Sequence, residues 1–297
     1  MAKELLGKEV NEALIADLKV RTAALRERGI CPALAIVRVG ARSDDLSYEK
    51  GAVKKGEAVG VAVKVFALPE DAACEDVLAV IDSINADDAI HGALIFQPFP
   101  AHLRPFRQEL CNRLDPRKDV DCLTDLSSAG VYQGRDDLGY APCTPAACME
   151  ILDYYGIDCK GKNAVVIGRS PVVGKPAAMM LLAKNATVTV CHTKTVNTAQ
   201  ICKGADMLLS AAGALGSLTK DYVRPGQVVL DVSMNYDPEK ITPKGKGGMS
   251  GDAVYEEVAA VVDAITPVPG GVGAVTTTVL MKHVVEAAEK QENTPCR

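Results

Sequence analysis

Residues 164–176, AVVIGRSPVVGKP, are the stretch from which the fold of this chain is inferred. The stretch begins with Val165, Val166 and Ile167, and such a short β-branched run is typical of a buried strand. Gly168 and Gly174 follow, and after them comes a helix-forming run. A strand, a glycine turn and a helix N-terminus place backbone N–H groups against a phosphate, so the stretch predicts a nucleotide site. The alternative is a tight turn that binds nothing, because the spacing is not the standard G-x-G-x-x-G.

Apolar patterning on both sides of this stretch predicts alternating helices and strands. In the first block we expect helices at 4–28, 43–59 and 72–85, and strands at 33–39, 61–66 and 92–96. In the second block we expect strands at 164–168, 187–191, 207–211 and 228–232, with helices between them and a last helix from about 276 to 290. This alternation predicts an α/β fold built on mainly parallel sheets.

Two segments lack this periodicity. Residues 111–145 are rich in Asp, Gly and Pro, and such a long irregular stretch is usually functional or a linker. Residues 235–250 also look like a loop. Gly213 and Asp231 fall at strand ends, and ligand sites of open α/β sheets lie at the carboxyl ends of strands.

The composition excludes several classes of protein. The chain has 297 residues, 48% hydrophobic, with a net charge of −5, which argues against nucleic-acid and membrane-surface partners. The N-terminus lacks the apolar core of a signal peptide, and no run approaches the roughly 20 apolar residues of a membrane span. The 10 cysteines and 4 histidines form no metal motif. We therefore expect a cytoplasmic protein with reduced thiols and no metal.

Seven motifs occur in a characteristic order along the chain. They are Gly40 with Tyr48 eight residues on, PRKDVD at 116–121, PCTP at 142–145, the stretch at 168–176, CHT at 191–193, GD at 251–252 and ITPVPGGVG at 265–273. In these motifs the chain resembles the methylenetetrahydrofolate dehydrogenase/cyclohydrolases of folate one-carbon metabolism, over almost its whole length. The resemblance implies two α/β domains with a cleft between them: a folate-binding catalytic domain of residues 1–141 plus 276–297, and a Rossmann-like NAD(P)-binding domain of residues 142–275.

The resemblance also implies a function. The family oxidises 5,10-methylenetetrahydrofolate to the 5,10-methenyl form by hydride transfer to a nicotinamide cofactor, and bifunctional members hydrolyse the product to 10-formyltetrahydrofolate. Family members are typically cytoplasmic homodimers that serve purine biosynthesis. Hydride transfer needs orientation of two rings more than a protein nucleophile, so the lack of a catalytic triad is expected. The alternatives are a non-catalytic folate- or nucleotide-binding homologue, and a dehydrogenase for another small substrate on the same fold.

The resemblance assigns substrate roles to residues that have ordinary alternatives. Asp121 matches the residue that hydrogen-bonds the pterin, although it could be a loop Asp that caps a turn. Tyr48 matches the aromatic that packs on the aminobenzoyl ring, although it could be a plain core tyrosine. Pro269, Gly270 and Gly271 would put unshielded backbone beside substrate or nicotinamide, or form only a tight turn.

The cofactor prediction depends on the residues after the strand at 187–191. An acidic residue at this point usually binds the ribose of NAD, but the chain has His192-Thr193-Lys194-Thr195. Arg169, Thr193 and Lys194 could accept a 2′-phosphate, so we favour NADP over NAD, with solvated surface lysines as the alternative interpretation. The predicted cofactor-binding residues are Gly168, Arg169, Ser170, Thr193 and Met234.

The chain departs from the family where hydrolysis is concerned. Bifunctional members carry a lysine in Y-V-x-x-K and a glutamine in V-Q-L-P-L-P, and the matching positions here are Ala52 and Phe96, with Gln97 one residue on. Our hypothesis is that hydrolysis is weak or absent. Lys55 offers an alternative catalytic base, because it shares a helical face with Tyr48 and lies about 5 Å, one turn, beyond Ala52.

Overall fold

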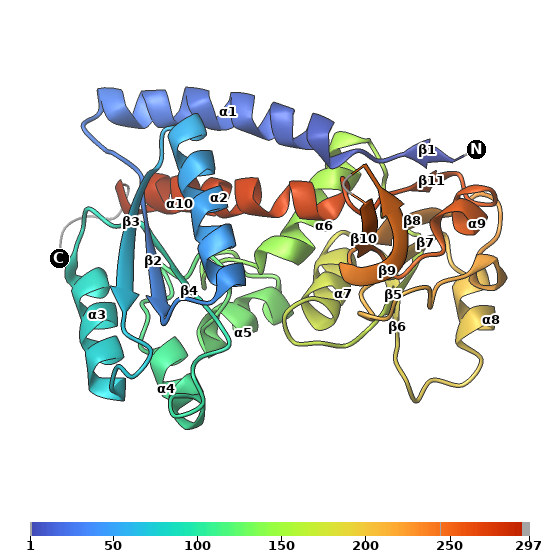
Figure 1. The fold of residues 1–297 in the computed structure, drawn as a ribbon. Coiled ribbons are helices and arrows are strands. Elements are labelled where there is room, and N and C mark those ends of the chain that lie inside the picture. The colour runs from blue at the N-terminus through green and yellow to red at the C-terminus, as the bar shows by residue number, and fades with distance from the viewer. Residues whose placement is uncertain (1, 244, 293–297) are drawn as a thin grey trace. The chain divides into compact units, whose positions relative to one another are not determined.

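The computed structural model describes residues 2–243 and 245–292, and the chain divides into two compact units (Figure 1). Unit 1 comprises Met1–Asn11 and Thr144–Thr276, and unit 2 comprises Glu12–Cys143 and Thr277–Arg297. The predicted α/β class with parallel sheets is confirmed in both units. Residues 1–11 were expected in the first block, but β1 (Lys3–Glu4) pairs with β11 (Ala264–Ile265) and so lies in unit 1.

Unit 2 contains a parallel sheet of 3 strands in the order β3-β2-β4. The strands are β2 (Ala33–Val39), β3 (Ala62–Leu68) and β4 (Gly92–Ile95). The helices are α1 (Gly7–Glu27, from Glu12 onward), α2 (Ser43–Val59), α3 (Cys74–Ala86), α4 (Arg107–Asn112), α5 (Asp125–Gln133) and α10 (Thr276–Glu292), with a 3-10 turn at Arg104–Phe106. Central strand β2 is almost continuously apolar because it is covered on both faces. Its Val37 packs with Ile81 of α3, Ile95 of β4 and Leu110 of α4 in one core cluster.

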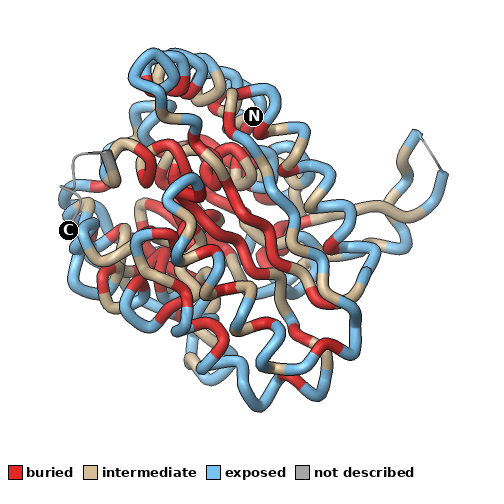
Figure 2. Tube along the Cα trace, turned by 90° about the vertical axis from the view of Figure 1, so that its left-hand side faces the viewer, coloured by how far each residue is buried: buried red, intermediate tan, exposed pale blue. Residues whose placement is uncertain are grey.

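Unit 1 contains a sheet of 6 strands in the order β1-β11-β8-β7-β5-β6, with every pair parallel. Besides β1 and β11, its strands are β5 (Asn163–Ile167), β6 (Thr187–Cys191), β7 (Met207–Ser210) and β8 (Val228–Asp231). Its helices are α6 (Cys143–Tyr154, from Thr144 onward), α7 (Gly174–Ala183), α8 (Thr198–Lys203) and α9 (Tyr255–Ala259), with 3-10 turns at Lys220–Tyr222 and Val272–Ala274. Strands β5, β7 and β8 are mostly buried, whereas the edge strand β6 is largely exposed; Figure 2 colours the residues by burial.

Strand β5 has β6 on one side and β7 on the other, although β6 precedes β7 in the chain. The chain therefore reverses direction across the sheet at β5. In open parallel sheets, ligands bind outside the carboxyl ends of the strands at such a switch point. The turn at 168–174 leaves β5 at this edge.

The structure also differs from the sequence-based prediction in the extent of several helices and strands. Residues 235–250 form an antiparallel hairpin of β9 (Asn235–Thr242) and β10 (Gly245–Ser250), not a loop. Its charged first strand and glycine-rich second strand hide the alternation that identifies strands. Residues 111–145 include α5, whose Thr124 hydroxyl accepts a hydrogen bond from Ser127 N. The first helix starts at Gly7, not at residue 4.

Gly51 and Gly56 both lie within α2 and form a matched pair for a stability test. A Cβ at Gly51 would meet nothing within 4 Å, whereas a Cβ at Gly56 would lie 2.7 Å from the Val61 carbonyl oxygen. We expect Gly51→Ala to raise the free energy of unfolding by about 0.5–1 kcal/mol, because it restricts the unfolded chain. Gly56→Ala should lower it by about 1–3 kcal/mol through overpacking. Urea denaturation of both variants checks this, and a change of the same sign in both would contradict the packing described.

Candidate functional site

The turn after β5 depends on glycine at two positions. Gly168 has a φ of +117°, and a Cβ there would lie 2.2 Å from the Ala211 carbonyl oxygen. A Cβ at Gly174 would lie 2.2 Å from the Gly168 carbonyl oxygen. The Ser170 hydroxyl accepts hydrogen bonds from Val173 N at 3.1 Å and Gly174 N at 3.4 Å, which orders the start of α7. The backbone of the turn at the switch point is therefore not shielded by side chains at Gly168 and Gly174.

The residues after β6 lie beside this turn. Gly168 N donates to the Cys191 carbonyl at 2.8 Å, so the ends of β5 and β6 are joined. His192 N then donates to the Thr195 hydroxyl at 2.9 Å, which closes a turn that carries Thr193. Arg169 and Thr193 are both exposed at this edge, and no acidic residue occurs in 192–195. This edge offers a cation and a hydroxyl to an anionic group.

A pocket lies at the carboxyl ends of β8 and β11. Its volume is about 240 Å³. It is lined by Asp231, Val232, Met234, Pro267, Val268, Pro269, Gly270, Gly271, Gly273 and Ala274. A Cβ at Gly271 would lie 2.6 Å from the Pro267 carbonyl oxygen, and Gly270 has a φ of +110°. The predicted residues Met234, Pro269, Gly270 and Gly271 therefore line one pocket, on a turn that needs its glycines.

In unit 2, Asp121 is held by the backbone of Cys143. Its Oδ1 accepts a hydrogen bond from Cys143 N at 3.0 Å. Burial raises the pKa of Asp121 to about 6, although the bond from Cys143 acts in the opposite direction. The carboxylate is therefore held in place and can still gain a proton just below neutral pH.

Tyr48 on α2 belongs to the same part of unit 2. Burial of its hydroxyl raises the pKa of Tyr48, with smaller contributions from the nearby Cys143 and Asp121, so the phenol stays protonated. Its ring contacts Phe96 edge to face, with centroids 5.8 Å apart, while the residue remains 37% exposed. Tyr48 thus lies within electrostatic range of Asp121, and Phe96 packs against the tyrosine ring.

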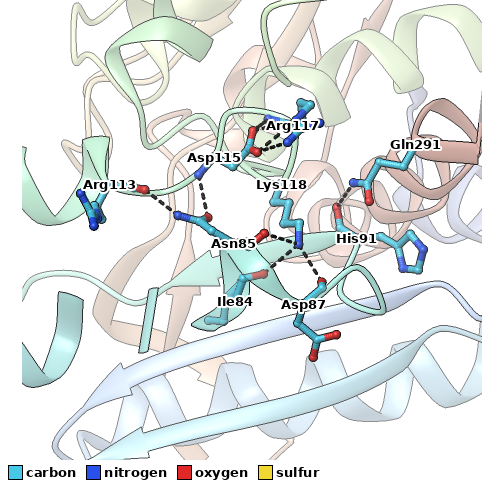
Figure 3. Close-up of polar contacts among 9 residues, drawn as sticks. All are labelled: Ile84, Asn85, Asp87, His91, Arg113, Asp115, Arg117, Lys118 and Gln291. Carbon is cyan, nitrogen blue, oxygen red and sulfur yellow. Dashed lines mark hydrogen bonds and ion pairs between the residues drawn. The ribbon is translucent and has the colours of Figure 1, made fainter. Parts of the chain in front are cut away.

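The segment that carries Asp121 is anchored by a buried lysine (Figure 3). Lys118 Nζ donates to the carbonyl oxygens of Ile84, Asn85 and Asp87 at 2.8, 3.2 and 2.8 Å, at the end of α3. Burial lowers the pKa of Lys118, and nearby aspartates act against this. Sequence reasoning did not identify this anchor, because nothing in KDVD indicates which carbonyls lie within reach of the lysine.

Asp119 is a second structural member of KDVD. It is fully buried, and its two carboxylate oxygens accept from Leu123 N and Thr124 N at 2.8 Å each. Asp119 therefore shapes the loop that follows, whereas Asp121 receives a single backbone N–H.

The residues at and next to the positions linked to hydrolysis are packed or hydrogen-bonded within the protein. Ala52 is fully buried on the packed face of α2. Gln97 is held by its neighbours, because its amide nitrogen donates to Cys111 Sγ at 3.1 Å and its oxygen accepts from Arg107 Nε at 2.7 Å. Lys55 is half-buried, and burial, followed by the charge of Lys54, lowers its pKa.

Strand β5 lies between β6 and β7, ends in a glycine turn and belongs to the sheet whose edge carries the pocket. This arrangement defines a dinucleotide-binding protein of the α/β class. Two family models specify the class further. The tetrahydrofolate dehydrogenase/cyclohydrolase catalytic domain matches residues 5–121, and the NAD(P)-binding domain of the same enzymes matches residues 142–292. The chain belongs to the tetrahydrofolate dehydrogenase/cyclohydrolase family, which confirms the resemblance.

Individual relatives agree with this assignment along the whole chain. The "Bifunctional protein FolD" of Carboxydothermus hydrogenoformans is 50% identical over 289 residues, 97% of this chain and 98% of that protein. The structure of bifunctional FolD from Campylobacter jejuni matches with a TM-score of 0.90 and 35% identity, over 98% of this chain and 99% of that one. The Trypanosoma brucei dehydrogenase-cyclohydrolase, complexed with NADP and an inhibitor, matches with a TM-score of 0.88 and 30% identity, over 99% of each chain.

The described residues form neither a membrane-spanning helix nor a metal-binding cluster. None of the helices they form combines the length and apolar character needed to cross a membrane. Over the same residues, no group of 3 or more His, Cys, Asp or Glu side chains is arranged to hold a metal ion.

Proposed function

We propose that this protein oxidises 5,10-methylenetetrahydrofolate to 5,10-methenyltetrahydrofolate by hydride transfer to NADP. The proposal rests on the different surroundings of the three charged residues in KDVD. Lys118 and Asp119 are occupied by hydrogen bonds to backbone groups. Asp121 accepts one backbone N–H, from Cys143, and lies within electrostatic range of Tyr48. A carboxylate suits the paired N–H donors of a pterin edge. The names of the relatives support the same activity.

The residues have roles in orientation. The nicotinamide accepts the hydride, and the protein sets the geometry of the two rings. Asp121 would accept hydrogen bonds from the pterin, and Tyr48 would pack on the aminobenzoyl ring. Pro269, Gly270 and Gly271 would form the wall against which nicotinamide or substrate lies. We also propose, on the family resemblance, a cytoplasmic homodimer whose one-carbon product serves purine biosynthesis.

The direct test incubates purified protein with methylenetetrahydrofolate and NADP and follows reduced cofactor. We expect turnover that depends on both substrates. Binding of the cofactor without turnover would contradict the proposal and support a non-catalytic homologue, and turnover of a different small substrate alone would support another dehydrogenase.

The choice of NADP rests on Arg169 and Thr193 at the ends of β5 and β6. We expect Arg169→Ala to raise KM for NADP about tenfold, because a charge-assisted hydrogen bond to the 2′-phosphate is lost. KM for NAD should change less than about twofold, since NAD has no phosphate at this position. Lys162→Ala, an exposed change at the amino end of β5, is the control. Equal effects on both cofactors would contradict the assignment of Arg169.

The pKa of Asp121 predicts how folate binding depends on pH. Only the ionised carboxylate accepts two N–H donors, and protonation sets in as the pH falls through about 6. Affinity for a stable folate analogue should therefore be constant near neutrality and fall about tenfold per pH unit well below 6. Asp121→Asn should bind weakly at every pH. An unchanged pH profile in this variant would show that a different group titrates.

We further propose that hydrolysis of the methenyl product is weak or absent in this chain. Burial of the short Ala52, the contact of Phe96 with Tyr48 and the two hydrogen bonds that hold Gln97 support this. Position 52 therefore has no ammonium group, because it is alanine, and position 96 has no amide, because it is phenylalanine. Lys55 is the competing candidate for a base, because it is half-buried on α2 and burial lowers its pKa.

Restoring the family residues tests this interpretation. The double variant Ala52→Lys/Phe96→Gln should gain hydrolysis of methenyltetrahydrofolate by at least about tenfold over the unmodified protein. Phe96→Gln alone should gain little and serves as the better-folding control. If the unmodified protein hydrolyses clearly above the buffer rate and Lys55→Ala abolishes this, the proposed loss is wrong.

A further inference from the structure

One buried carboxylate in unit 1 collects hydrogen bonds from two separate loops. Asp252 is fully buried. Its oxygens accept from Ser210 Oγ at 2.9 Å, Ala212 N at 2.8 Å, Ala214 N at 2.8 Å, Ser233 Oγ at 2.8 Å and Asn235 Nδ2 at 3.1 Å. These donors compensate the loss of water around the carboxylate, as a buried charge requires.

The donors come from the carboxyl ends of adjacent strands. Ser210 is the last residue of β7 and pairs with Asp231, the last residue of β8. Residues 212 and 214 follow β7, and residues 233 and 235 follow β8. The Ser233 hydroxyl also accepts from Gly213 N at 3.1 Å, which links the two loops directly.

Asp252 is itself fixed by the end of β8. Its backbone N–H and that of Ala253 donate to the Asp231 carboxylate at 3.1 and 2.8 Å. Gly251 allows this approach, because a Cβ there would lie 2.0 Å from Asp231 Oδ2. Burial raises the pKa of Asp231 to about 6, against the backbone hydrogen bonds that lower it.

Both loops border the candidate dinucleotide site. The first contains Ala211, whose carbonyl oxygen would lie 2.2 Å from a Cβ at Gly168 of the glycine turn. The second contains Met234, which lines the pocket at the ends of β8 and β11. A displacement of either loop would change the space available to the cofactor.

We propose that Asp252 is a positioning residue for the dinucleotide: one carboxylate fixes the loops after β7 and β8 and thereby shapes the cofactor site. The cofactor class rests on the proposed function. Asp252 acts through the loops, since its oxygens are occupied by protein donors. Its removal therefore affects the binding of the cofactor more than that of folate.

The test measures binding of NADPH to the full-length protein by cofactor fluorescence, without folate, together with kinetics. We expect Asp252→Asn to raise Kd for NADPH and KM for NADP about tenfold, with KM for folate changed less than about threefold. The milder Ser233→Ala, which removes one donor, should raise Kd about threefold. This second variant keeps the test decisive if the first folds poorly.

Rescue and a matched control separate positioning from general stability. Adding Asn235→Asp to Asp252→Asn restores the hydrogen bond between positions 235 and 252 with donor and acceptor exchanged. It should recover part of the NADPH affinity, because the bond from Ala214 N to the same carboxylate oxygen is not restored. Asp206→Asn removes a carboxylate at the amino end of the same sheet, where it accepts from Asn163 N at 2.9 Å. It should lower Tm without changing Kd.

Unchanged Kd in Asp252→Asn and Ser233→Ala would overturn the inference, and so would an unmodified protein that binds no NADPH. If both variants change Kd, and the unmodified protein binds NADPH but does not turn over methylenetetrahydrofolate, the proposed function is contradicted and the positioning role is supported.

Discussion

The close approach of backbone to backbone at the end of β5 is the constraint on which unit 1 depends. Gly168 lies so near the Ala211 carbonyl that any side chain would displace the loop after β7. The same loop is fixed from the other side by the Asp252 carboxylate. Gly168 thus permits the close approach, and Asp252 fixes the approaching loop, at the sheet edge where open parallel sheets bind their ligands.

In unit 2, buried charged residues fix the segment that carries Asp121. In the proposed function, the Asp121 carboxylate must be held in place and still accept hydrogen bonds from the pterin. Lys118 and Asp119 secure the segment through hydrogen bonds to backbone groups, so that Asp121 itself needs only one from the protein backbone. Both units therefore use buried ionisable residues to fix loops: Lys118 and Asp119 in unit 2, and Asp252 in unit 1.

Prediction from the sequence was most successful where periodicity is strong. The strands around Val37 and Val165 are apolar runs between glycines, and their parallel pairing follows from the helices between them. The hairpin at 235–250 was missed because charges and glycines replace alternation there. The strand at Lys3–Glu4 was missed because two charged residues become a strand only through pairing with β11.

The roles of Asp252 and Lys118 depend on groups distant in sequence, so local pattern could not reveal them. Motif matching, by contrast, proposed Asp121 and Tyr48, and the structure places them within electrostatic range of each other.

The central proposal is that this chain retains the oxidation and that its hydrolysis of the methenyl product is weak or absent. The most direct measurement follows reduced cofactor and methenyltetrahydrofolate together, in one reaction started with methylenetetrahydrofolate and excess NADP. The account predicts that the two accumulate in equal amounts and that the methenyl compound then decays at the rate observed in buffer alone. Formation of reduced cofactor with 10-formyltetrahydrofolate as the product, and no accumulation of the methenyl compound, would contradict it.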